Sequence, residues 1–310
     1  WRSENIDIIN NTISIDSPKA DRSRYAAIYL ALNFGNSNII GNEIVNIQVN
    51  RTETPKYGAG ILFNASLDTV FIANNMISIN NFENIGAATG NQVFGIGFDN
   101  AAGNSYNAIY HNTINVGSSD ETGTHAAFGS IGHTTTGQMW DLKNNIFVVD
   151  QDADNANAIF WPINGTTNLD ADYNNYYVSG TNANIGHYNT TDAATVADWM
   201  TASGLDENTT EVSVEFVSET DLRLTGASDG DENLAASPLP FFTADIDGND
   251  RSLTAPYKGA FEGSALDVSF EITIEDFDLV SPADSITIDL GSDPEGSILF
   301  AWEAAQANAE

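Results

Sequence analysis

The sequence predicts an all-β protein, a parallel β-helix of about six coils with three strands in each coil. The first observation is a repeat: a short apolar stretch with a turn-forming pair in its middle returns six times, at intervals of 30 to 37 residues. The second observation is that apolar residues stand two positions apart within each stretch, as in strands rather than helices. Repeats of this length are typical of units that stack to bury a common core.

Each repeat turns at a pair of residues whose second member is always asparagine. The residue before it is Asn, Gly or His, types that tolerate the positive φ of a sharp corner. In a stack of coils these asparagines lie above one another, and we expect their amides to hydrogen-bond from coil to coil. The aligned corner asparagines are Asn11, Asn42, Asn75, Asn112, Asn145 and Asn175.

Three short strands are predicted in each coil from apolar columns counted from the corner asparagine. The first strand is centred fourteen positions before it, on Ile28, Ile61, Phe98, Ile131 and Trp161. The second is centred three positions before it, on Ile8, Ile39, Ile72, Ile109, Leu142 and Asp172. The third has one column on Ile13, Ile44, Ile77, Ile114, Phe147 and Tyr177, and another on Ile15, Asn46, Ile79, Val116, Val149 and Ser179. Trp140, which aligns with Ile6 and Val70, and Trp161 are predicted to be core residues.

Over residues 1–190 this pattern resembles the right-handed parallel β-helix proteins of the pectate-lyase-like superfamily. The shared features are the three-strand coil, the short asparagine corner and a variable loop after the third strand, as in residues 46–56 and 80–92. The resemblance implies a right-handed coil, and in the lyase members the substrate lies along the first strand and its flanking loops. Because the superfamily also includes hydrolases, tailspikes, adhesins and non-catalytic surface proteins, it indicates the fold and leaves the function open.

Residues 191–265 are predicted to form a C-terminal cap and closing strands. A short helix is expected over 190–205, begun by Thr191 or Asp192 and ended by Gly204, with Trp199 pointing into the tube. The later stretch 245–263 resembles the closing segment of secreted bacterial β-helix proteins. It matches at Asp245, Asp247, Gly248, Arg251, Gly259, Ala260, Phe261 and Glu262, and departs from them at Lys258.

Residues 266–310 resemble the first strands of an immunoglobulin-like or fibronectin-like β-sandwich module. Such a module needs about 100 residues, so we expect the polypeptide to continue beyond Glu310. Because the chain opens inside the first repeat, we also expect a mature protein or a fragment with sequence upstream of Trp1.

Charge and composition exclude several classes of partner. There are 43 acidic and 10 basic residues, a net charge of −33, which disfavours nucleic acid and anionic membranes. The chain has no cysteine and no apolar stretch long enough to span a membrane. The acidity suits the solvated surface of a secreted or cell-surface protein.

The first strand shows little of the chemistry that a polysaccharide lyase or hydrolase needs. Its outward positions include one acid, Asp99, and no base, and they contain no paired carboxylates. We therefore expect no catalytic residues on this face. The alternative is a lyase or hydrolase that acts on acidic polysaccharide with loop residues, and with Arg24 or Lys56 as the base.

Six of the ten basic residues lie within the first 56 positions. Arg24 precedes Tyr25, and Lys56 precedes Tyr57, at corresponding points one coil apart. Together with Tyr29, these residues form a predicted ligand-binding patch for an anionic glycan. The alternative is that Asp21 and Glu53 pair with the two basic residues on solvated loops, where such pairs contribute little.

The stretch 245–250, DIDGND, has the alternating Asp and Asn of a calcium loop, but Pro256 stands where an EF-hand needs glutamate. The alternative is an Asp-Gly turn in which Arg251 pairs with Glu262. No cofactor is predicted, calcium stays open, and the four histidines show no metal-ligand spacing.

We therefore expect an extracellular, non-catalytic β-helix within a larger bacterial surface or secreted protein. It would act as a stalk, an adhesin or a glycan-binding module, with an acidic polysaccharide or a cell-surface component as its partner.

Overall fold

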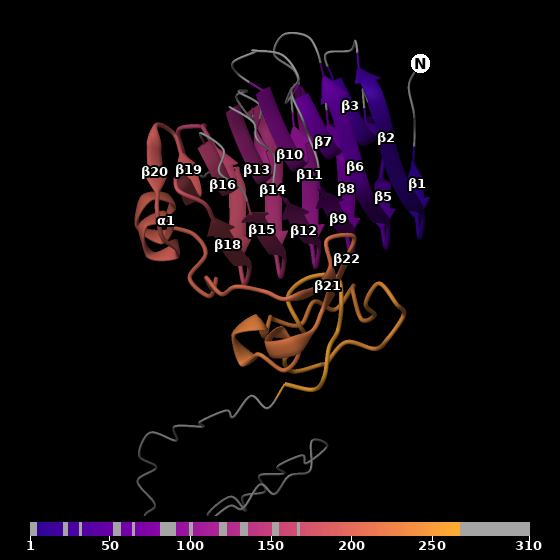
Figure 1. Ribbon diagram of the computed structural model, residues 1–310, viewed down its shortest axis with the longest axis vertical. Helices are drawn as coiled ribbons and strands as arrows, with labels where there is room; N and C mark the ends of the chain where they lie inside the picture. Colours follow the sequence, from indigo (N-terminus) through magenta and orange to yellow (C-terminus); the bar gives the residue numbers. More distant parts are fainter. Residues whose placement is uncertain are drawn as a thin grey trace, which may run out of the picture. The chain divides into compact units, whose positions relative to one another are not determined.

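The computed structural model describes residues 5–20, 24–30, 33–51, 57–63, 66–80, 91–98, 102–117, 123–130, 136–150, 155–165 and 168–266. Within them the chain forms the predicted all-β parallel solenoid with one α-helix (Figure 1). Three sheets of stacked parallel strands form its sides, and β20 is the one antiparallel strand described in them.

The strands fall into three long sheets and one hairpin. The first sheet contains β3 (Arg24–Leu30), β7 (Tyr57–Phe63), β10 (Asn91–Phe98), β13 (Gly123–Ser130), β16 (Asn155–Trp161), β19 (Ala183–Tyr188) and β20 (Thr191–Ala193). The second contains β1 (Asp7–Ile9), β5 (Ser37–Ile40), β8 (Ser66–Ala73), β11 (Ala102–Tyr110), β14 (Thr136–Lys143) and β17 (Leu169–Asp172), with β4 (Asn33–Phe34) beside β8. The third contains β2 (Thr12–Ala20), β6 (Glu43–Arg51), β9 (Met76–Ile79), β12 (Thr113–Val116), β15 (Ile146–Asp150) and β18 (Asn175–Ser179). The hairpin pairs β21 (Phe216–Ser218) with β22 (Asp221–Leu224), and short 3₁₀ turns follow at Gly226–Ser228 and Glu232–Leu234.

Complete sets of three strands run from β3 to β18, and partial sets lie at both ends. The expectation of about six three-strand coils therefore fits in part, and the right hand of the coil stays a prediction. The boundaries at residues 190 and 265 stay predictions too. All but the first residue of the predicted β-sandwich module, 266–310, lie outside the described part of the chain.

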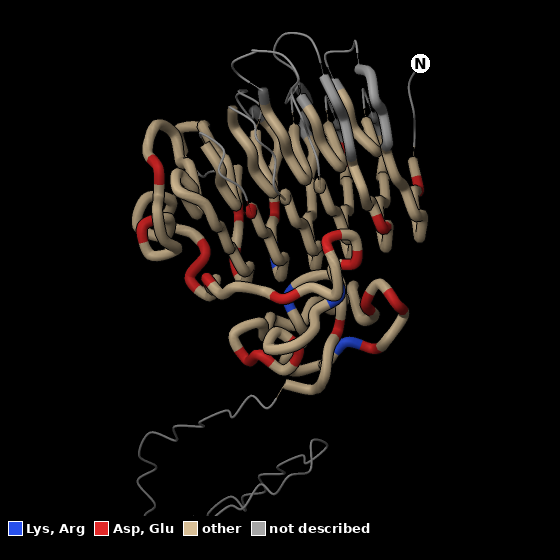
Figure 2. Tube along the Cα trace, viewed as in Figure 1, with Lys and Arg blue, Asp and Glu red and all other residues tan. Residues whose placement is uncertain are grey.

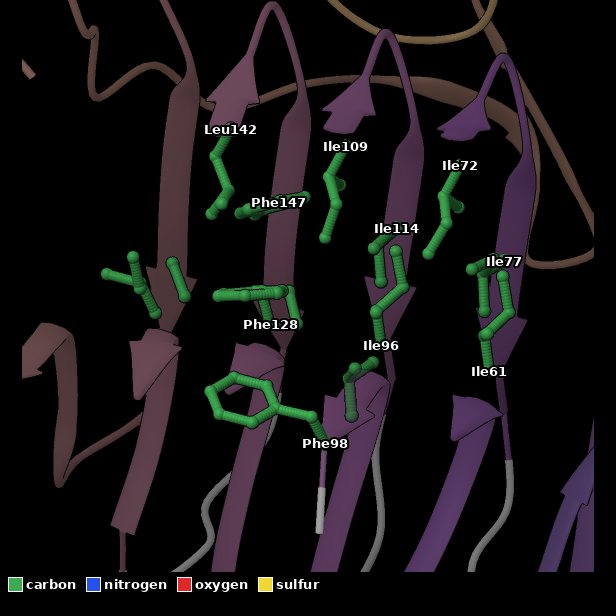
Figure 3. Close-up of a cluster of buried hydrophobic side chains, with 14 of the residues drawn as sticks. Ile61, Ile72, Ile77, Ile96, Phe98, Ile109, Ile114, Phe128, Leu142 and Phe147 are labelled. Atoms are coloured by element: carbon green, nitrogen blue, oxygen red, sulfur yellow. The ribbon is translucent and has the colours of Figure 1, made fainter. Parts of the chain in front are cut away.

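The predicted apolar columns fill the tube. Ile77 pairs in register with Ile44 on one side and Ile114 on the other, and all three are fully buried. Figure 3 shows such side chains pointing inward from successive strands of all three sheets. Trp140 and Trp161 are also buried core residues, as predicted.

The asparagine ladder is confirmed. The backbone N–H and the Nδ2 of Asn75 both donate to Oδ1 of Asn112, at 3.1 and 2.9 Å. Asn112 donates in the same way to Asn145, at 2.9 and 3.1 Å. Residues just before these corners, such as Asn74 and His111, have φ values of 53° and 52°, which explains their types.

Two predicted alignments of the third strand and its corner are wrong. The last ladder residue is Asn174 rather than Asn175, because Asn145 donates to Asn174 Oδ1. This shift by one residue places Ala171, Tyr176 and Val178 in the apolar columns. The predicted members of these columns are the next residues in the chain, Asp172, Tyr177 and Ser179. In the second coil, Asn46 is a bulged residue with φ 53°, so Ile15 pairs with Ile47.

The predicted first-strand column is also wrong from the third coil onward. Ile61 pairs with Ile96, and Phe98 pairs with Phe63, so the column shifts by two residues. The shift arises because the connection from the first strand to the second varies in length, in addition to the loop after the third strand. Ile131 lies outside the described residues.

A short helix, α1 (Val196–Ser203), covers the end of the tube beyond β19 and β20. Its N-cap is Thr195, which forms a capping box with Asp198, rather than the predicted Thr191 or Asp192. Gly204 ends it in the left-handed conformation, as predicted. Trp199 is fully buried in the core, so the predicted cap is confirmed. Among the described residues, no helix is long and apolar enough to cross a membrane.

Residues 207–266, here called the closing segment, run back along the asparagine corners (Figure 1). The Gly259 N–H donates to the Asn144 carbonyl at 2.7 Å, and the Ala260 N–H donates to Thr113 Oγ1 at 2.8 Å. A Cβ at Gly259, which has φ 85°, would lie 2.5 Å from Thr113 Oγ1, so this contact requires glycine. The matched closing motif therefore fastens the segment to the side of the solenoid.

Candidate functional site

The sequence-predicted patch lies at the beginning of the first sheet. The register places Arg24 beside Tyr57, one residue away from the expected match of Arg24 with Lys56. Lys56 and the side chains of Arg24 and Tyr57 lie outside the described residues. The role of this patch in binding therefore stays a prediction.

Tyr25 and Tyr29 lie on opposite faces of β3. Tyr25 is half-buried and packs against the core, whereas Tyr29 is 44% exposed. The strand departs from simple alternation because the consecutive residues Ala27 and Ile28 both contact the core. The structure therefore does not bring these two predicted ligand residues together.

The first sheet carries one described His–Asp pair, between His187 of β19 and Asp192 of β20. His187 Nδ1 lies 2.6 Å from Asp192 Oδ1, its Nε2 lies 3.0 Å from the Asn189 carbonyl, and its ring stacks on Phe160. Both ring nitrogens of His187 therefore have partners within the chain. Asp99 lies outside the described residues.

A different set of side chains comes together on the outer face of the second sheet. We call it the tyrosine–aspartate cluster; its members are Tyr106 and Tyr110 of β11, Asp141 and Lys143 of β14, and Asp170 of β17. Residues two and four apart on a strand share a face, and the register sets Asp141 beside Asp170. The strand order and register therefore place these side chains on the same face of the second sheet.

Asp141 is the centre of the cluster and is almost fully buried, with 6% of its surface exposed. The hydroxyls of Tyr106 and Tyr110 both donate to its Oδ2, and the two hydroxyl oxygens lie 2.9 Å apart. Lys143 Nζ lies 3.1 Å from Asp141 Oδ1 and 3.0 Å from Asp170 Oδ2. Each polar group thus has a fixed position before any ligand arrives.

The electrostatics of the cluster set the charge states of its tyrosines and its lysine. Burial and the hydrogen bond to Asp141 raise the pKa of both Tyr106 and Tyr110. Burial lowers the pKa of Lys143, but the hydrogen bonds and charges of Asp170 and Asp141 outweigh it, and the net shift is upward. At neutral pH the tyrosines are therefore neutral and the lysine is charged, so none of the three is suited to act as a general base.

Apolar surface adjoins these polar groups. Tyr106 and its register neighbour Met139 are 39% and 37% exposed. On the other side, Tyr110 packs edge-on against Phe242 of the closing segment, with ring centroids 5.7 Å apart. Phe242 and Leu239 help to line a hollow of about 320 Å³. A ligand at the cluster would therefore meet an exposed aromatic ring beside fixed polar groups.

The DIDGND stretch forms a turn that is held by the Asp245 carboxylate. The Asp245 carboxylate accepts hydrogen bonds from the backbone N–H groups of Asp247, Asn249 and Glu262, and from Asn249 Nδ2. Arg251 pairs with Glu262 at 3.0 Å, as the alternative predicted. Among the described residues, no group of three or more acidic or histidine side chains is placed to hold a metal ion.

The sequence contains a signal for the tyrosine–aspartate cluster that the first-strand search missed. Aromatic and charged residues occupy the outward positions of the second strand in successive coils, at Tyr106, Tyr110, Asp141, Lys143 and Asp170. These positions lie outside the first strand, where the lyase resemblance places the substrate.

No family model, no curated protein and no solved structure matches this chain. The site must therefore be interpreted from its own geometry.

Proposed function

We propose that this chain is a non-catalytic β-helix of a larger surface or secreted protein, and that it binds carbohydrate at the tyrosine–aspartate cluster. The observation that carries the proposal is the Tyr106 side chain, which is 39% exposed while its hydroxyl is held by the buried Asp141. Tyrosine rings with fixed hydroxyls offer an apolar face and a polar edge at little entropic cost. Sugars have the matching character, with apolar C–H faces and hydroxyl rims.

The charge of the cluster favours a neutral glycan. Lys143 is balanced by Asp141 and Asp170, so the cluster keeps a net negative charge. Acidic residues also outnumber basic residues along the described chain (Figure 2). A polyanion would approach against this field, whereas a neutral sugar would not, and its hydroxyls would find both donors and acceptors here.

An acidic glycan at the Arg24–Lys56 patch is the second candidate. Its support is the concentration of six of the ten basic residues within the first 56 positions. Binding there should weaken steeply with salt, because exposed charges are screened over about 8–10 Å at moderate ionic strength. The lyase or hydrolase alternative would act on the same class of polymer, and release of unsaturated product from alginate or pectin would support it.

A glycan array with purified variants tests the proposal. Tyr106→Ala should lose binding to neutral glycans, because it removes the exposed ring without emptying the core. Tyr29→Ala is the matched control for neutral glycans, since Tyr29 is a similarly exposed tyrosine on the first sheet, far from the cluster in sequence. It should bind neutral glycans like the parent chain, and its effect on acidic glycans reports on the N-terminal patch instead.

Two outcomes would contradict the proposal. Equal binding by Tyr106→Ala and the parent chain would exclude the cluster as the site. Loss of binding to acidic glycans in the double variant Arg24→Ala with Lys56→Ala, with Tyr106→Ala unaffected, would place the site at the N-terminal patch. A melting temperature within a few degrees of the parent shows that each variant is folded.

A further inference from the structure

The two ends of the solenoid differ in how well they are covered. Beyond β19, the helix α1 and the strand β20 close the tube, and Trp199 is fully buried. At the other end, β1, β2 and β3 are the outermost strands of their sheets among the described residues. Ile8 and Ile13 in that first coil are only half-buried, whereas Ile39 and Ile44 one coil further on are fully buried.

The asparagine ladder has a direction. From Asn11 to Asn145, the backbone N–H and the Nδ2 of each corner asparagine donate to Oδ1 of the asparagine in the next coil. Asn11 follows the rule as a donor, because its N–H and Nδ2 both lie 3.0 Å from Asn42 Oδ1. Among the described residues, no donor reaches Asn11 Oδ1. Within the described part of the chain, the ladder therefore begins with an acceptor that has no donor.

The closed end shows how the chain itself ends such a ladder. Asn174 has spare donors, and two acceptors meet them: Thr209 Oγ1 at 3.0 Å from the backbone N, and Asp206 Oδ1 at 3.1 Å from Nδ2. Asp206 is buried and also accepts from Trp199 Nε1 at 2.8 Å. At the capped end, acceptors thus satisfy the spare donors of the ladder. At the open end, the acceptor Asn11 Oδ1 needs a donor.

We propose that the exposed end of the first coil is an interaction surface for a further parallel β-solenoid coil with an asparagine corner. The partner's corner asparagine would donate its N–H and Nδ2 to Asn11 Oδ1. Its strands would pair with the free edges of β1, β2 and β3, and its apolar residues would cover Ile8 and Ile13. Edges and core would then be covered as they are between all other coils.

The path of the chain favours a partner coil in the polypeptide that leads into β1. In each complete coil the chain passes from the first sheet to the second and then to the third. A strand that leads into β1 therefore belongs beside the free edge of β3. A coil built in this order stacks in the parallel register that the ladder needs.

A second copy of this chain fits the surface poorly. Head-to-tail stacking is blocked, because α1 covers the other end. Head-to-head stacking would bring two Asn11 Oδ1 acceptors together with no donor between them, and buried acceptors without donors are costly.

The test uses a fusion in which a copy of residues 123–162 precedes Trp1. This copy carries a corner of its own, whose Asn145 would donate to Asn11. Hydrogen exchange of the β1 and β2 amides is compared between the parent chain and the fusion. We expect exchange in the fusion to slow by about tenfold or more, since two hydrogen bonds to Asn11 form.

The matched control is the same fusion with Asn145→Asp in the added copy. It keeps the shape of the corner but sets a carboxylate against Asn11 Oδ1, so most of the protection should be lost. Unchanged exchange in the first fusion, or an added coil that stays unprotected while the rest is folded, would overturn the proposal. Dimers of the parent chain that protect the same amides would also overturn it, in favour of a second copy.

Discussion

Removing one buried rung of the asparagine ladder should destabilise the protein far more than removing the exposed first rung. The perturbation is Asn112→Ala. Asn112 is fully buried, and its Oδ1 accepts from the Asn75 N–H at 3.1 Å and from Asn75 Nδ2 at 2.9 Å. Its Nδ2 donates to the carbonyls of Ile72 and Tyr110.

The expected loss of unfolding free energy depends on which partners of Asn112 keep another hydrogen bond in the variant. Asn75 Nδ2 still donates to the Ile39 carbonyl, and Asn145 Oδ1 still accepts from the backbone N–H at position 112. The Asn75 N–H keeps no acceptor, and a buried unpaired donor costs about 1–3 kcal/mol. With the loss of the other side-chain bonds, at about 1 kcal/mol each, we expect a total loss of about 2–5 kcal/mol.

The control is Asn11→Ala. Asn11 is exposed, so water replaces its lost partners and the change should cost no more than about 1 kcal/mol. Equilibrium urea unfolding, followed by tryptophan fluorescence and circular dichroism, measures both variants. A loss at Asn112 no larger than that at Asn11 would refute the view that the buried ladder stabilises the coil stack.

Three further predictions concern the core and the closing segment. Ile77→Ala should lower the free energy of unfolding by about 2–5 kcal/mol, and an unchanged urea midpoint would mean that the site does not behave as packed core. Arg251→Ala should cost about 3–5 kcal/mol, because it leaves the Glu262 carboxylate without its buried cation; a loss below about 1 kcal/mol in the same assay would contradict this. Burial lowers the pKa of Lys258 to about 7, against 10.5 for an ordinary lysine. The cost of its buried charge is therefore full below pH 7 and fades as the pH rises to 10.5. The stability difference between the parent chain and Lys258→Met should shift in favour of the parent across this window, and a constant difference would disprove the assignment.

The sequence by itself determined the local features of this fold. Alternating apolar residues predict strands, and a turn former before an asparagine predicts a corner, because both depend on neighbours within a few positions. The burial of Ile77 and Trp199, the helix stop at Gly204 and the Arg251–Glu262 pair all followed from such patterns.

The tertiary structure decided the register between coils and everything that depends on it. Connections of different length separate the strands, so counting from one anchor misplaces Asn174 and the column at Phe98. A pattern within one coil cannot show which residues of the next coil lie beside it, because hydrogen bonds between coils set that pairing. For the same reason, only the stacked sheets bring Tyr106 to Asp141, and only the returning closing segment places Phe242 against Tyr110.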